Sequence, residues 1–150
     1  MENRKTNLFE GLKYPNGDVY KGKIINGKRN GYGILILSSG IKVEGSFLDD
    51  IIVGQCIIND EKGNVYIGFI ENGSLNGKCV IKYANNESYE GYVKDNKKCG
   101  QGRFTFADGS FYLGEFKEDK FNGKGTIFNE KGILKTGYWV DGVLEKNKNI

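Results

Sequence analysis

Paired carboxylates are the side chains in this sequence with the most obvious catalytic potential. Asp49–Asp50 and Asp60–Glu61 each place two acids side by side, and neighbouring carboxyl groups can act as general acid and general base. Both pairs lie in segments rich in Gly, Asn, Asp and Lys, a composition typical of turns. Turn carboxylates are usually solvated, so we interpret these pairs as surface charges and expect no enzyme activity.

Other catalytic and metal-binding chemistry has little support. The chain contains no histidine, which excludes Ser–His–Asp and Cys–His nucleophile pairs and histidine-based metal sites. Its Gly-x-Gly pairs resemble phosphate-binding loops only superficially, because we expect no helix N-terminus to follow them. Three cysteines form no Cys-x-x-Cys pair. We therefore expect no metal site and no cofactor.

The charges are balanced and intermixed. The net charge is +3, and lysines alternate with Asp and Glu along the whole chain. This pattern indicates a solvated surface and lacks the clustered basic face of a nucleic-acid-binding protein. We therefore expect no nucleic-acid partner. The absence of a long apolar stretch indicates a cytoplasmic protein.

Glycine repeats at a fixed interval of 23 residues. One column of glycines is unbroken: Gly22, Gly45, Gly68, Gly91, Gly114 and Gly137. Tyrosine precedes it by two positions in four of the six copies, and an apolar residue follows it by two positions in all six. Such self-similarity is the signature of a repeat architecture, in which each unit packs against its neighbours.

Within each unit the pattern has a period of two, which indicates β-strands. Tyr20, Gly22 and Ile24 share one strand face, and a turn-like segment separates them from Gly31, Gly33 and Leu35. Each unit is therefore predicted to be a β-hairpin. The predicted fold class is all-β, a single elongated and twisted antiparallel sheet of stacked hairpins. Glycines on one face would let neighbouring tyrosine rings lie flat across the backbone.

The repeat pattern also sets the expected domain boundaries and cysteine positions. We expect an N-terminal lead-in at residues 1–11, a domain of six repeats at 12–143 with the last one partial, and a polar tail at 144–150. Leu12 should lie in register with Leu35. Cys56 and Cys79 occupy one column of adjacent repeats, about 9–10 Å apart and beyond disulfide reach. Cys99 is expected in a turn.

The unit GDVYKGKIINGKRNGYG, repeated as GSFYLGEFKEDKFNGKG, resembles the MORN repeat. The resemblance spans about residues 12–143. It implies an elongated, twisted and often curved sheet with an aromatic groove, used as a scaffold in cilia, flagella, parasite cytoskeletons or membrane contacts. The chain departs from the family pattern in carrying tryptophan only at Trp139 of the tryptophan column. Val43 and Lys135 replace the repeat tyrosine.

Two surfaces are candidates for partner binding. The first is a groove lined by the aromatic residues of the repeat-invariant face, namely Phe47, Tyr66, Tyr89, Tyr112 and Phe116. The same rings could equally serve only to pack over the glycines and hold the sheet together. The second candidate is an apolar group on the opposite face, Ile57, Val65, Ile67, Phe69, Val80 and Tyr92, since clustered exposed apolar side chains mark interfaces.

These features predict a non-catalytic scaffold or adaptor that binds a peptide or helix of a partner protein. Family resemblance implies a cytoskeletal, ciliary or membrane-associated assembly. One alternative is an anionic-phospholipid-binding module with weak membrane contact, because the first repeat carries five basic residues, Lys13, Lys21, Lys23, Lys28 and Arg29. Another is a detached regulatory subunit of an enzyme. Unpaired strands at the sheet ends would also permit a homodimer.

Overall fold

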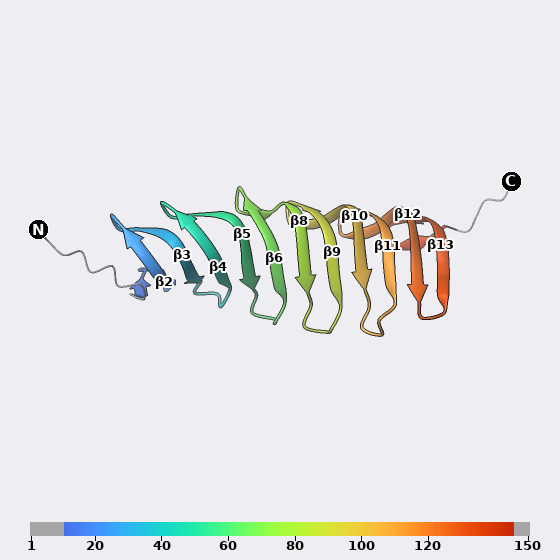
Figure 1. Ribbon diagram of the computed structural model, residues 1–150, viewed down its shortest axis with the longest axis horizontal. Coiled ribbons are helices and arrows are strands. Elements are labelled where there is room, and N and C mark those ends of the chain that lie inside the picture. Colours follow the sequence, from blue (N-terminus) through green and yellow to red (C-terminus); the bar gives the residue numbers. More distant parts are fainter. Residues whose placement is uncertain (1–10, 146–150) are drawn as a thin grey trace, which may run out of the picture. The chain divides into compact units, whose positions relative to one another are not determined.

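The computed structural model describes residues 11–145, which contain fourteen strands and no helix. The chain divides into two compact units, residues 1–70 and 71–150, and each is described by itself. In the first unit the strands are β1 (Gly11–Lys13), β2 (Val19–Ile25), β3 (Lys28–Ile36), β4 (Lys42–Leu48), β5 (Ile51–Asn59) and β6 (Val65–Glu71), the last of which ends one residue past the unit boundary. They pair antiparallel in chain order (Figure 1).

The second unit repeats this arrangement. Its strands are β7 (Ser74–Leu75), β8 (Gly77–Lys82), β9 (Ser88–Lys94), β10 (Lys97–Thr105), β11 (Phe111–Lys117), β12 (Lys120–Asn129), β13 (Gly132–Val140) and β14 (Val143–Leu144). From β8 onward each strand pairs antiparallel with the next one in sequence (Figure 1). The prediction of an open antiparallel sheet of stacked hairpins is therefore confirmed in each unit.

Two kinds of turn separate the strands. Short turns have two central residues with positive φ, as in Asp95–Asn96 and Glu118–Asp119, the geometry of type I′ turns that suits two-residue hairpins. Longer turns carry one left-handed residue, usually glycine. Asn86 occupies this position with φ 69°, because asparagine tolerates the left-handed region better than other side chains do.

Tyrosine rings cover paired glycines on one face of the sheet, which we call the inner face. Gly91 pairs with Gly102, and Gly114 pairs with Gly125. A Cβ atom at Gly102 would lie 2.6 Å from Cε2 and from the hydroxyl oxygen of Tyr89. The missing side chains therefore make the space in which the rings lie.

Each hairpin curls toward the inner face. Gly100 and Gly123 have φ of 63° and 103°, and both lie where the strand register shifts through a bulge, which bends the strand. The Lys98 ammonium lies 5.4 Å from the centroid of the Tyr83 ring. Tyr83 belongs to the turn between β8 and β9, whereas Lys98 lies beside the turn at the other end of β9. A straight seven-residue strand would separate such ends by about 20 Å.

The curl encloses a core within a single sheet layer. Tyr112 stacks on Phe121 with ring centroids 3.9 Å apart, and each of these rings meets Trp139 edge-on at 5.5 Å. Tyr89 contacts Phe116 of the next repeat in the same way at 5.1 Å. Each fully buried large side chain contributes about 2–3 kcal/mol of hydrophobic free energy. The repeat thus builds its core between neighbouring hairpins.

Hydrogen bonds tie each hairpin tip to the preceding hairpin. The Lys98 backbone N–H donates to Asp119 Oδ1 at 2.8 Å, and the Asp119 N–H donates to the Lys98 carbonyl at 3.1 Å. Asn96 makes the same pair of bonds with Leu75 at 2.8 and 3.1 Å. At Gly142, which has no side chain, only the backbone bond to the Phe121 carbonyl remains.

The cysteines follow the repeat with one correction. Cys56 and Cys79 are buried and form no disulfide; they pair across strands with Gly68 and Gly91, which places them on the glycine-lined face. The expected turn position of Cys99 is wrong, because this residue lies half-buried within β10. The bulge at Gly100 extends strand pairing into a segment whose polar composition is typical of a turn.

The described strands run from Gly11 to Leu144. Leu12 and Leu35 both pair with Tyr20, which confirms their common register. The predicted lead-in lies outside the described residues except for Gly11, and so does the predicted tail beyond Glu145.

Candidate functional site

The aromatic residues predicted to line a groove lie mostly in the interior. Tyr89 and Tyr112 have no exposed surface, Phe47 and Phe116 are 5% and 4% exposed, and Tyr66 is half-buried. Side chains with no accessible surface cannot contact a partner directly. The burial supports the reading in which these rings pack over the glycines and hold neighbouring hairpins together.

The buried tyrosine hydroxyls are used within the fold. The Tyr89 hydroxyl donates to the Tyr92 carbonyl at 2.6 Å, and the Tyr112 hydroxyl donates to the Glu115 carbonyl at 2.8 Å. Burial raises the pKa of Tyr112 to about 12 and also raises the pKa of Tyr89. Both hydroxyls therefore stay neutral near pH 7 and act as structural donors.

Asp60 and Asp50, one member of each predicted carboxylate pair, accept hydrogen bonds from nearby turn and strand residues. Burial alone would raise the pKa of Asp60, but hydrogen bonds from Asn64, Tyr66 and the Lys62 N–H lower it below its ordinary value. A carboxyl group held ionised in this way is a poor proton donor at neutral pH. Asp50 likewise accepts a hydrogen bond from the Arg29 N–H at 2.9 Å, which assigns it to a hairpin tip.

The face opposite the tyrosines, which we call the outer face, carries the second predicted set. In the first unit, Ile57 pairs with Ile67, Gln55 with Phe69 and Asn59 with Val65, so the predicted apolar residues of this unit share one face. Phe69 is 45% exposed and the other three are half-buried. The structure thus brings these four residues together at the surface.

In the second unit, Tyr92 and Val80 of the predicted set lie on the outer face of β9 and β8. Tyr92 is 44% exposed and Val80 is half-buried. From Tyr92, exposed and half-exposed side chains continue across five consecutive strands. We call this set the outer row; it consists of Tyr92, Gln101, Glu115, Lys124 and Tyr138.

Register and side-chain contacts establish the outer row. Gln101 pairs with Glu115, and Lys124 pairs with Tyr138. The Lys124 N–H donates to Glu115 Oε2 at 2.5 Å, which joins the two pairs. The Lys124 ammonium lies 5.8 Å from the centroid of the Tyr138 ring, within the range of a cation–π contact. The row is therefore a continuous surface across the strands.

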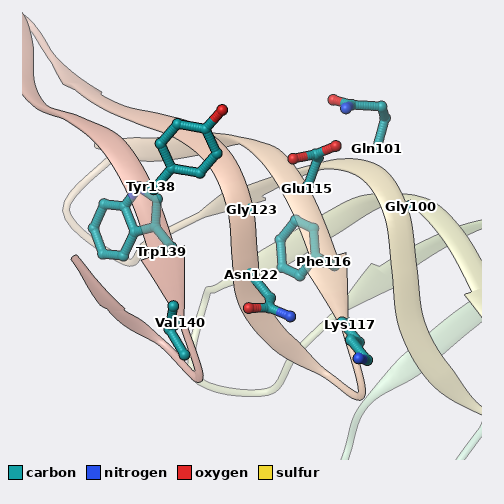
Figure 2. A pocket seen from close by; sticks show the side chains of 10 residues that line it. All are labelled: Gly100, Gln101, Glu115, Phe116, Lys117, Asn122, Gly123, Tyr138, Trp139 and Val140. Carbon is teal, nitrogen blue, oxygen red and sulfur yellow. The ribbon is translucent and has the colours of Figure 1, made fainter. Parts of the chain in front are cut away.

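A hollow of about 640 Å³ lies along this row. Gln101, Glu115 and Tyr138 of the outer row line it together with Gly100 and Gly123. Phe116 and Trp139 of the inner-face core also reach its lining. Figure 2 shows the side chains of Gln101, Glu115 and Tyr138 projecting to the same side from β10, β11 and β13. A Cβ at Gly100 would lie 3.9 Å from Cβ of Tyr92, so the Tyr92 side chain stands beside this end of the hollow.

Glu115 is the only carboxylate of the outer row. Its side chain is half-buried, and none of the ion pairs found within residues 11–145 involves it. Lys117, which also lines the hollow, is exposed. The site thus combines aromatic area from Tyr92 and Tyr138, a central acceptor and a glycine-lined floor, which suits binding more than bond-making chemistry.

Sequence reasoning found Tyr92 but missed the other four residues of the outer row. A usable signal was present, since Tyr92, Glu115 and Tyr138 occupy one 23-residue column. The residue types differ between copies, however, and the bulges at Gly100 and Gly123 decide which residues of neighbouring strands face one another. Bulge positions are not readable from the alternation of residue types.

Residues 11–145 contain no group of three or more Cys, Asp or Glu side chains that could hold a metal ion. The same part of the chain has no helix able to cross a membrane.

Comparison with solved structures finds similar folds at low sequence identity. The Drosophila melanogaster SAS-4 TCP domain, solved in complex with a proline-rich motif of Ana2, is 16% identical with a TM-score of 0.54, covering 85% of this chain and 71% of that chain. The Danio rerio CPAP TCP10 domain is 12% identical with a TM-score of 0.48, covering 87% and 68%. The first of these likenesses shows the fold alone.

Comparison with curated proteins finds no match. The family model of the MORN repeat matches residues 20–42, 66–88, 89–111 and 112–129. These segments make up more than half of the chain, and they contain the buried tyrosines and paired glycines on which the core depends. The chain therefore belongs to the MORN-repeat family.

Proposed function

We propose that this chain is a non-catalytic protein-interaction module that binds an extended segment of a partner protein along the outer row. The observation that carries the proposal is the contrast in exposure within one strand. Tyr89 is fully buried, whereas Tyr92, three residues later, is 44% exposed beside an open hollow. The buried tyrosines of the inner face are used by the fold, whereas Tyr92 and Tyr138 offer accessible aromatic area on the outer face.

The residue types of the outer row support this use. Tyrosine offers a large amphipathic contact at little entropic cost, and aromatic residues are enriched at interfaces. Tyr138 is 55% exposed and stands at the opposite end of the row from Tyr92. The SAS-4 TCP domain, which has a similar fold, binds a proline-rich motif of Ana2; we extend peptide binding to this chain as part of the proposal.

A random peptide library displayed on phage tests the proposal directly. Peptides selected on the purified protein are expected to lose binding to a Tyr92→Ser/Tyr138→Ser double variant. Both residues are exposed, so the double variant should fold, which its thermal unfolding curve checks. Ile133→Ser is the matched control, since Ile133 is an exposed apolar residue of the outer face that lies outside the row.

The proposal is supported if the selected peptides bind the wild type and Ile133→Ser equally and do not bind the double variant. It is overturned if no peptide is enriched, or if the enriched peptides bind the double variant as well as the wild type. The experiment needs no knowledge of the natural partner. Because it uses the intact chain, it does not assume that either unit folds alone.

The proposal includes a cellular setting in a cytoskeletal or ciliary assembly, which the family resemblance implies. A fluorescently tagged wild-type chain should concentrate on such a structure, and the Tyr92→Ser/Tyr138→Ser variant should be diffuse. Equal localisation of both chains would remove the outer row from this part of the proposal.

A further inference from the structure

The outer row repeats at the spacing of the hairpins. Tyr92, Glu115 and Tyr138 lie on β9, β11 and β13, so successive members are two strands apart. Neighbouring strands are about 4.8 Å apart, which places these side chains at intervals of about 9.6 Å. A ligand that crosses the strands meets the same wall position once in every such interval.

A polyproline II helix has a closely matching period. It rises about 3.1 Å per residue with three residues per turn, so residues i and i+3 face the same side about 9.3 Å apart. A β-strand ligand places same-side residues about 6.7 Å apart and therefore drifts out of step with the hairpins within one repeat. Of these two extended conformations, only polyproline II keeps register across β9 to β13.

From this match, and resting on the proposed function, we infer that the partner segment is a polyproline II helix that runs across the strands of the second unit. Two prolines three residues apart lie on either side of Glu115. One proline packs over Gln101 between Tyr92 and Glu115, and the other packs over Lys124 between Glu115 and Tyr138. Proline rings pack well on tyrosine faces, and a preformed helix loses little entropy on binding.

Charge adds a second specificity element. The Glu115 carboxylate separates the two proline positions, and one of its oxygens accepts a hydrogen bond from the Lys124 N–H. Since no ion pair within the described chain uses Glu115, a lysine or arginine between the prolines can pair with it. The exposed Lys117 and Lys124 side chains flank this position and disfavour a second cation. The ligand class is therefore a Pro-x-x-Pro segment with one basic residue between the prolines.

Synthetic blocked peptides with a Pro-Lys-Ala-Pro core test the inference on the full chain by fluorescence anisotropy. The reference peptide is compared with one that carries alanine in place of both prolines and with one whose prolines are separated by one residue. Each change is expected to weaken binding about tenfold. Tyr92→Ser and Tyr138→Ser are each expected to weaken the reference peptide about tenfold, and Ile133→Ser to leave it unchanged.

Glu115→Gln tests the charge element, because glutamine keeps an acceptor for the Lys124 N–H. This variant should bind the lysine peptide no better than a peptide with alanine at that position, whereas the wild type prefers lysine. Nitroxide labels on the peptide test its direction: a label at one end should broaden amide signals of β9, and a label at the other end those of β13. Broadening confined to β13 would indicate strand addition at the sheet edge and overturn the crossing geometry.

Failure of this inference is distinguishable from failure of the proposed function. If library peptides without prolines bind through Tyr92 and Tyr138, and the altered proline spacing has no effect, the partner is not polyproline II but the interaction module stands. If no peptide depends on Tyr92 and Tyr138 for binding, both this inference and the proposed function are wrong.

Discussion

Alternate residues of the same strands have opposite roles on the two faces of the second unit. On the inner face, Tyr89 and Tyr112 are fully buried over paired glycines. On the outer face, Tyr92 and Tyr138 are about half exposed and border an open hollow. The repeat therefore fixes residue type where the hairpins pack and leaves it free where a ligand would bind. Substitutions on the two faces should have separable effects.

Gly102→Ala should break the inner face and have the largest effect. The new Cβ would lie 2.6 Å from Cε2 of Tyr89, and neither the ring nor the paired strand can move freely. We expect a loss of about 3 kcal/mol in the free energy of unfolding, measured by urea denaturation. Gln101→Ala, one residue away on the outer face, should change it by no more than about 0.5 kcal/mol. Similar losses for the two variants would contradict the division between faces.

Alkaline pH should also destabilise the inner face, with an effect smaller than that of Gly102→Ala. The ordinary pKa of tyrosine is 10.0, and burial raises that of Tyr112 to about 12; burial also raises the pKa of Tyr20 and Tyr89. Above pH 10.0 the unfolded chain ionises these hydroxyls while the folded chain does not. Stability present below that pH is therefore lost as the pH rises to about 12. Thermal unfolding followed by circular dichroism should show this fall.

Tyr112→Phe provides the control for the alkaline effect. It removes one of the buried ionisable hydroxyls, so its unfolding temperature should fall less steeply over the same pH range. Superimposable slopes for the variant and the wild type would show that Tyr112 does not contribute.

Asn96→Gly should weaken the hairpin tip by a smaller amount. The glycine keeps the positive φ of this turn position, which is 68°, and removes only the side-chain acceptor of the Leu75 N–H. We expect a loss of about 1 kcal/mol and faster hydrogen exchange of the Leu75 amide. An unchanged exchange rate would show that this bond does not protect the tip.

Gly142→Asn tests the same hairpin-tip hydrogen bond by adding a side-chain acceptor where the wild type has none. Gly142 makes the backbone bond of the tip without a side-chain acceptor for the Phe121 N–H. Asparagine should supply that acceptor and raise the free energy of unfolding by about 0.5 kcal/mol, because the cost of a left-handed asparagine offsets part of the gain. Calorimetry would detect the change, and a lower unfolding temperature would contradict it.

The strand pattern was predictable from sequence because its causes are local. Tyrosine two positions before glycine, repeated every 23 residues, predicts the face and register that the Gly91–Gly102 and Gly114–Gly125 pairs confirm. The left-handed residue at Asn86 was predictable for the same reason. Each inference needs only the residue's own conformational preference and its position in the repeat.

The curl and the outer row were not predictable, because both depend on where each strand bends. A Gly-x-Gly pair does not reveal that Gly100 takes positive φ while Gly102 stays in the ladder beneath Tyr89. In a sheet without that bend, Tyr89 would line an open groove, which is what the alternation of residue types alone predicts. With it, the ring is enclosed, and replacing the repeat tyrosines would test folding before it tests binding.

Strand pairing in chain order has a consequence for synthesis of the protein. In the first unit, and from β8 onward in the second, every strand pairs with its neighbours in sequence. The longest hydrogen-bonded contacts described, such as Lys98 to Asp119, span 21 residues. When a hairpin emerges from the ribosome, the strands that pair with it have therefore just been synthesised or are synthesised next. Translation adds about 5–20 residues per second, so the second residue of a contact that spans 21 residues is synthesised within a few seconds of the first. Folding can thus keep pace with translation, so that little apolar strand is left waiting for a distant partner.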